Sequence, residues 1–207
     1  MTQREKVVEQ VSEMVKTFGL KSVRMDDVAN ALGMSKRTLY EMFGGKEELL
    51  YESICFMMDE RLRKLSEKMK AYDSMLEILL LSVKELCSDD PRHDTAHRLS
   101  FNLKKFYPAI YERVQRRHSE TGLSGLRWAL DRCREEGYLD EHADIELMAQ
   151  LFLINAGVLM SEDRVVLPEG VTRDKAFSVL IINFLRGLAS VEGLRKIDEI
   201  LARERES

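Results

Sequence analysis

The sequence predicts an all-α fold, and three observations lead to this prediction. Charged residues make up 33% of the chain, Gly and Pro are sparse, and Met occurs 11 times, a balance that favours helices over sheets. Apolar residues recur at helical spacing between recognisable helix starts and stops. With 207 residues, of which 44% are hydrophobic, the chain can bury the core of one ordinary domain and a smaller one.

The first part of the chain predicts four helices. Thr2 and Glu5 can form a capping box, and the apolar repeat that follows ends at Gly19, so the first helix lies between them. Ser35 is a suitable N-cap for the third helix, and the fourth begins after Gly44 and Gly45. The expected ranges are 2–18, 25–32, 36–43 and, for the longer fourth helix, from near Lys46 to Met69.

Six more helices are expected along the rest of the chain. Caps or turn residues mark each of their starts, and Gly122 and Gly125 could bend or split the longest one. The first of these helices starts at a capping box of Ser74 and Glu77 and ends near Ser88. The second runs from the turn 'SDDPR' to Tyr107, and the third from Pro108 towards Glu136. The last three begin at Asp144, Thr172 and Ser190.

The stretch from Asp26 to Phe43 predicts a helix-turn-helix. Gly33 lies four residues after Ala29, where a glycine can adopt a left-handed conformation, end one helix and turn the chain into the next. The apolar residues then point into one small core, and a polar face with a free N-terminal end is left outside. Such a face can enter the major groove of DNA. The outward residues are Lys36, Arg37, Thr38 and Tyr40.

The segment 'LGMSKRTLYEMFGGKEELL' resembles the signature of the tetracycline-repressor-like (TetR) family of bacterial regulators. The likeness covers about the first fifty residues, including 'FGLKSVRM' and 'DDVANALG'. Farther along, 'REEGYLDEHADIEL' and 'FLRGLASVEG' resemble the family's lead-ins to its dimerisation helices. The resemblance implies a DNA-binding domain over residues 1–47 and a helical ligand-binding and dimerisation domain over 48–207.

The resemblance also implies roles for single residues. Arg37 is the candidate for reading guanine, since its fork matches O6 and N7, and Tyr40 and Lys46 are candidates for phosphate contacts. Arg24 stands where the family usually has Thr or Ser as a cap, which leaves this cap in doubt. The expected DNA-binding residues are Arg24, Ser35, Lys36, Arg37, Thr38, Tyr40 and Lys46. Structural alternatives are a solvated Lys-Arg face, a Tyr40 that covers the core and a Lys46 paired with Glu47 or Glu48.

Two late helices, near 145–162 and 173–189, are apolar on nearly all sides. A helix of this kind must be buried on both sides, and a chain of this size has little interior for that. We therefore expect a homodimer that joins these helices in a two-fold four-helix interface and binds a pseudo-palindromic DNA operator. The alternative is that both helices are central core.

The part of the chain after residue 47 is expected to sense a small molecule, because the resemblance implies an effector-binding domain. If an effector exists, it releases DNA by favouring the conformation that binds DNA less well. The candidate lining residues, which can equally be plain core, are Met57, Met58, Phe101, Phe106, Trp128, Met148 and Phe152.

Two other classes of protein compete with a regulator. The chain carries a net charge of −4, although residues 1–50 contain 8 Lys and Arg against 8 Asp and Glu, so a nucleic-acid face must be local. His93 and His97 could hold a divalent metal in a helical enzyme, but no HExxH motif occurs. The second alternative is a helical interaction protein without DNA binding. The sequence predicts no catalytic residue, metal or cofactor.

The sequence also bears on where the protein acts. The three cysteines lack CxxC spacing and indicate buried thiols. No signal peptide or membrane-spanning run is recognisable in the sequence. We therefore expect a cytoplasmic protein that does not enter a membrane.

Overall fold

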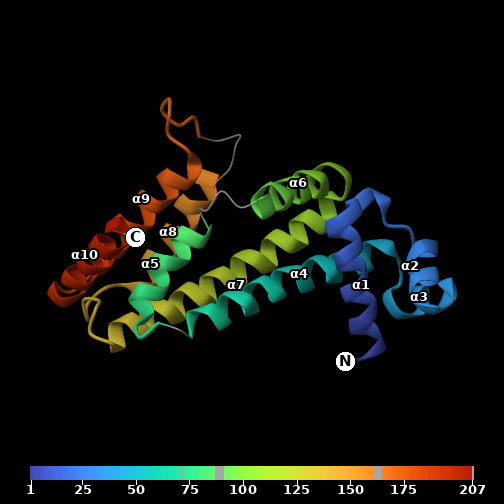
Figure 1. Ribbon diagram of the computed structural model, residues 1–207, viewed down its shortest axis with the longest axis horizontal. Helices are drawn as coiled ribbons and strands as arrows, with labels where there is room; N and C mark the ends of the chain where they lie inside the picture. Colours follow the sequence, from blue (N-terminus) through green and yellow to red (C-terminus); the bar gives the residue numbers. More distant parts are fainter. Residues whose placement is uncertain (71, 87–90, 161–164, 207) are drawn as a thin grey trace. The chain divides into compact units, whose positions relative to one another are not determined.

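The computed structural model describes residues 1–70, 72–86, 91–160 and 165–206. Within these helices, the structure describes all side chains except those at 65, 68–69, 82–86, 91–97, 160 and 204–206. Ten α helices and one 3-10 helix form in the described residues, which confirms the prediction of an all-α fold (Figure 1). In chain order they are α1 (Gln3–Phe18), η1 (Leu20–Ser22), α2 (Met25–Ala31), α3 (Lys36–Phe43), α4 (Lys46–Met69), α5 (Met75–Leu86), α6 (Pro91–Phe106), α7 (Pro108–Glu135), α8 (Ile145–Met160), α9 (Arg173–Leu188) and α10 (Val191–Glu206).

The chain divides into two compact units, each with its own hydrophobic core. The first unit comprises residues 1–66 and 90–118, and the second comprises 67–89 and 119–207. The first core joins α1 to α4 with residues of α6 and α7, and the second joins α5, the later part of α7 and α8 to α10. The boundary expected near residue 47 is a functional one, and it stays a prediction.

Most of the predicted helix starts are confirmed by hydrogen bonds. Thr2 and Glu5 form a complete capping box at α1. Ser35 Oγ accepts from Thr38 N–H at 3.0 Å, and Asp144 Oδ1 accepts from Leu147 N–H at 3.0 Å. The hydroxyls of Thr172 and Ser190 accept in the same way from Lys175 N–H and Gly193 N–H.

Two local predictions are refined by the structure. Ser74 Oγ accepts from Glu77 N–H at 3.2 Å, but the first amide of α5, that of Met75, donates instead to Glu136 at 3.0 Å. The Glu77 carboxylate pairs with Arg203 at 3.0 Å. The long helix α7 runs unbroken through its two glycines, because neighbouring residues of high helix propensity outweigh their cost.

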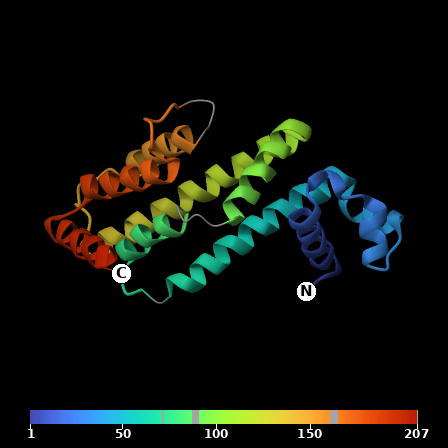
Figure 2. The same cartoon turned by 45° about the horizontal axis from the view of Figure 1, so that its top comes forward.

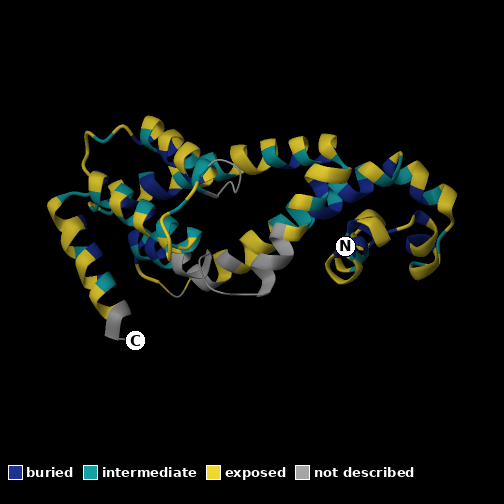
Figure 3. Cartoon of the chain, turned by 90° about the horizontal axis from the view of Figure 1, so that it is seen from above, coloured by how far each residue is buried: buried dark blue, intermediate teal, exposed yellow. Residues whose placement is uncertain are grey.

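In the second unit, α8 and α9 pack side by side (Figure 2). The ring of Phe152 on α8 contacts those of Phe177 and Phe184 on α9, with centroid distances of 6.0 and 4.6 Å. An isolated bridge between Leu139 and Ala189 ties the loop before α8 to the end of α9. The helices carry buried residues on one side and exposed residues on another (Figure 3).

Candidate DNA-binding face

The turn between α2 and α3 has the predicted glycine geometry. Gly33 has φ +61°, a left-handed conformation that side chains with a Cβ adopt at a cost. Met34 N–H donates to Ala29 C=O at 3.0 Å, and Gly33 N–H donates to Asn30 C=O at 3.3 Å. These two bonds satisfy carbonyls at the end of α2 and direct the chain into α3.

The apolar side of α3 packs into the first core and holds the helix in place. Leu39 and Phe43 are buried in the first core, together with Val28 and Ala29 of α2. Gly44, with φ +70°, ends α3, and its N–H donates to Tyr40 C=O at 2.8 Å. Because the apolar side is held in this way, the polar side of α3 is left on the surface.

The outer side of α3 carries the predicted contact residues. Ser35, Lys36, Arg37 and Tyr40 are exposed, and Thr38 is half-buried. Arg37 is the most open of the charged groups, with 87% of its side chain exposed, and its Nε donates to Glu41 Oε1 at 2.7 Å. This contact does not use the two terminal nitrogens of the guanidinium, which are the atoms that suit a guanine edge.

Arg4 holds the end of α3, a role that the sequence did not suggest. Its guanidinium donates to the carbonyl of Met42 and to both carboxylate oxygens of Glu52, with Nε 2.9 Å from Oε2. It also lies over the ring of Phe43, 4.4 Å from the centroid. A cation at the C-terminal end of a helix is favourable. No local motif signals it, since 38 residues separate Arg4 from Met42.

Lys46 is the first residue of α4, and its contact with a phosphate stays a prediction. It is half-buried, and Nζ lies 5.8 Å from the ring centroid of Tyr107. Glu48 pairs with Arg113 at 2.7 and 3.0 Å, and this hydrogen-bonded contact lowers the pKa of Glu48. The carboxylate of Glu48 is therefore engaged by Arg113.

Arg24 lies at the start of α2 without acting as a side-chain cap. It is exposed and occupies the N-cap position, but its side chain accepts no bond from the helix, since a guanidinium has no acceptor. Asp26 and Asp27 instead place negative charge in the first turn, which suits the positive end of the helix.

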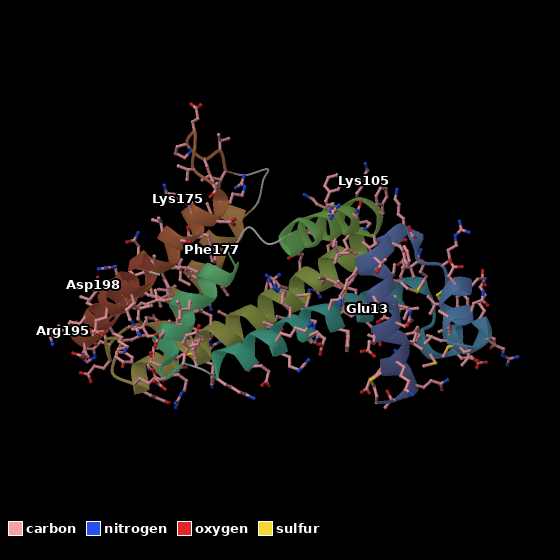
Figure 4. The ribbon with its side chains drawn as sticks, in the orientation of Figure 1. Glu13, Lys105, Lys175, Phe177, Arg195 and Asp198 are labelled. Carbon is pink, nitrogen blue, oxygen red and sulfur yellow. The ribbon has the colours of Figure 1, made fainter. Side chains whose placement is uncertain are left out.

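The predicted ligand-lining residues fall in different surroundings and are divided between the two units. Met57 and Met58 pack against the first core. Lys105 on α6 (Figure 4) has two aromatic neighbours. Its ammonium lies 5.8 Å from the ring centroid of exposed Phe101 and 5.4 Å from that of Phe106. In the second unit, Phe152 is buried in the core and Met148 packs against it. Their role in binding a ligand stays a prediction.

Trp128 lines an open cleft in the second unit. Trp128 is 59% exposed, and the cleft, of about 470 Å³, lies between the start of α5 and the later part of α7. The other lining residues are Tyr72, Asp73, Ser74, Met75, Ile78, Arg132 and Glu136.

Some of the residues that suggested a metal site or buried thiols are described by the structure and some are not. The side chains of His93 and His97 lie outside the described residues. Among the residues that are described, no group of three or more His, Cys, Asp and Glu side chains is arranged to hold a metal. Cys55 and Cys133 are buried thiols, and burial raises the pKa of Cys133 to about 12. In the described part of the chain, no helix is both long and apolar enough to cross a membrane.

The fold and the exposed side of α3 define a DNA-binding transcriptional regulator of the helix-turn-helix class. Residues 12–52 match the family model of the bacterial regulatory proteins of the tetR family. This match lies in the N-terminal part of the chain and agrees with the resemblance seen in the sequence. Members of the family are transcription factors and not enzymes, in agreement with the prediction for this chain. No curated protein matches the chain.

Solved structures share the fold over nearly the whole chain. A transcriptional regulator from Cytophaga hutchinsonii is 15% identical, with a TM-score of 0.65, and the match covers 90% of this chain and 98% of that one. A TetR-family regulator from Agrobacterium tumefaciens is 17% identical, with a TM-score of 0.55 and coverages of 90% and 97%. A candidate regulator from Saccharomonospora viridis in complex with choline is 15% identical, with a TM-score of 0.57 and coverages of 90% and 97%. At these identities the likeness establishes the fold.

Proposed function

We propose that the chain is a repressor that binds a pseudo-palindromic operator as a homodimer and is released by a small-molecule effector. The observation that carries the proposal is the exposed polar side of α3, held over a buried apolar side. In this proposal the protein acts in the cytoplasm, where bacterial DNA lies.

The contact residues divide by the part of the duplex that they suit. We assign base reading to the first turns of α3, with Arg37 bidentate to a guanine, and phosphate contacts to the side chains around that helix. Lys46 adds its charge to the open amides at the start of α4. The proposed contacts are Arg24, Ser35, Lys36, Arg37, Thr38, Tyr40 and Lys46.

The exposed side of α8 supports the proposed dimer. Leu147, Leu151 and Ile154 recur at helical spacing and are exposed, whereas Ala149 and Phe152 on the other side are buried in the second core. Val179 on α9 is exposed as well. An apolar stripe of this kind is costly in water and is covered well by the same stripe of a second copy. Pairing of α8 and α9 would then form a four-helix interface.

The effector is proposed by analogy of fold. The similar structure from Saccharomonospora viridis contains choline, and we propose that this chain also binds a small molecule. The helix α4 continues from the first unit into the second, so it is our candidate for the coupling between ligand and DNA. The candidate lining residues remain Met57, Met58, Phe101, Phe106, Trp128, Met148 and Phe152.

The test is a selection of fragments from the source genome with the purified full chain. We expect recovery of a short inverted repeat whose half-sites are about 34–36 Å apart or a multiple of that distance, bound by an even number of chains. Deletion of the gene that encodes this protein should raise transcription of the gene beside the selected site. A fall in transcription would make the protein an activator, and recovery of no common sequence would refute operator recognition.

A further inference from the structure

An ion pair joins the first turns of α2 and α3 on the face that carries the candidate DNA contacts. Lys36 Nζ lies 2.9 Å from Oδ1 of Asp26 and 3.1 Å from Oδ2. Both side chains are well exposed, at 49% and 64%. The hydrogen bond from Lys36 to Asp26 raises the pKa of Lys36. The ammonium of Lys36 therefore faces a carboxylate of its own chain.

The position of the pair matters because Lys36 lies on the side of α3 that carries the candidate DNA contacts. Asp26 reaches it from the first turn of the neighbouring helix α2. Sequence-independent affinity for DNA comes from Lys and Arg that neutralise phosphates and release counterions. A lysine that an internal carboxylate already neutralises contributes less to this affinity.

We propose that Asp26 is a specificity-determining residue, which withholds Lys36 from the phosphates of non-cognate DNA. Exposed ion pairs are weak, so close contact of α3 with a matching operator is enough to break the pair and free Lys36. The looser contact of α3 with other sequences does not break the pair. The inference rests on the proposed operator binding and adds a residue outside the seven contacts assigned above.

Asp27 is a matched control within the same helix turn. It is exposed, carries the same charge and also lies in the first turn of α2, but the ion pair with Lys36 is made by Asp26. Asp26→Asn and Asp27→Asn therefore change the net charge equally. They differ in whether Lys36 is released.

The experiment measures affinity over a series of salt concentrations by fluorescence anisotropy. The probes are the fragment selected from the genome and a scrambled duplex of the same length and composition. For Asp26→Asn on the scrambled duplex, we expect a salt slope steeper by about one unit per chain and at least about threefold tighter binding at low salt. On the selected fragment the slope should change less, so the ratio of the two affinities should fall.

A second variant isolates the pair itself. In a Lys36→Gln background, Asp26→Asn should leave the slope on the scrambled duplex unchanged, because no cation remains to be released. If the Asn variant does not fold, Asp26→Ser removes the same carboxylate and keeps a polar helix start.

The outcomes separate this inference from the proposed function. Equal effects of Asp26→Asn and Asp27→Asn would reduce the effect to net charge and overturn the role of the pair. A gain that persists without Lys36 would overturn it as well. If the wild-type chain binds the selected fragment no better than the scrambled duplex, the proposed function itself has failed, and the inference fails with it.

Discussion

Two exposed helix faces of this chain differ in chemistry. The outer side of α3 presents two hydroxyls, two cations and a phenol. The hydroxyls of Ser35 and Thr38 contact each other, and Lys36 and Arg37 form ion pairs with carboxylates. The outer side of α8 presents Leu147, Leu151 and Ile154, and Ile154 is 62% exposed. Both helices are held by a buried apolar side, so their packing alone does not distinguish them.

The difference in chemistry supports a different proposed partner for each face. A charged face is stable in water and exchanges its solvent and ion pairs for phosphates and base edges. An apolar face gains free energy only when it is covered. In our proposal the first face binds DNA and the other binds a second copy of the chain, and a substitution in either face tests its proposed partner.

The largest effect is expected from a charge in the apolar face. Ile154→Glu would bury an unpaired carboxylate in the proposed interface, which costs several kcal/mol. We expect monomers at micromolar concentration in sedimentation velocity, and at least about a hundredfold loss of operator affinity, because the two half-sites are then bound separately.

Val191→Glu is the control for this change. Val191 is 70% exposed at the start of α10, where a negative charge suits the helix dipole, and we place it outside the interface. This variant should stay dimeric. If Ile154→Glu also stays dimeric with full operator affinity, the second copy does not cover α8.

A smaller effect is expected on the charged face from Arg37→Ala. Loss of a bidentate guanine contact should cost about 1–3 kcal/mol and relax the preference at one base position in each half-site. Binding to a library of single-base operator variants measures both. Weakening that is uniform across the library would show that Arg37 contacts the DNA backbone.

Glu41→Gln tests the same contact indirectly. Because Glu41 accepts from Nε of Arg37, this variant should also reduce the preference for one base.

Lys46→Ala should weaken binding to all sequences alike. Each phosphate that the protein no longer neutralises should flatten the salt slope by about one unit. The alternative is that Lys46 is structural, since Nζ lies near the ring of Tyr107. Tyr107→Leu removes the ring and keeps the lysine, so it should preserve the slope. A slope that Lys46→Ala leaves unchanged would reject the phosphate role.

Much of the fold was predictable because its signals are local. Thr2, Ser35 and Thr172 cap the helices that the sequence assigned to them, and Gly33 takes the expected left-handed conformation. In each case the side chain acts on its own helix turn, so spacing of a few residues is enough to find it.

The missed features depend on residues that are distant in sequence. Glu136 caps α5 from 61 residues away, and Arg4 holds the end of α3 from 38 residues before it. The Asp26 to Lys36 pair spans the glycine turn. Periodicity places such residues on a surface, but only the packing of helices decides which charged groups meet.

The smallest effects are expected from the loss of one helix cap in each unit. Ser35→Ala and Thr172→Ala each remove a hydroxyl that accepts from an amide of the first turn, Thr38 N–H at 3.0 Å and Lys175 N–H at 3.2 Å. Each loss costs about 1 kcal/mol. The affected amide should then exchange its hydrogen about fivefold faster, because the free energy of local opening falls by about that amount.

Operator affinity separates the two caps. Thr172→Ala should leave operator affinity unchanged. Ser35→Ala should lower it modestly, because the turn that frays carries Lys36 and Arg37. Equal operator affinities for both variants would mean that the first turn of α3 does not contact DNA.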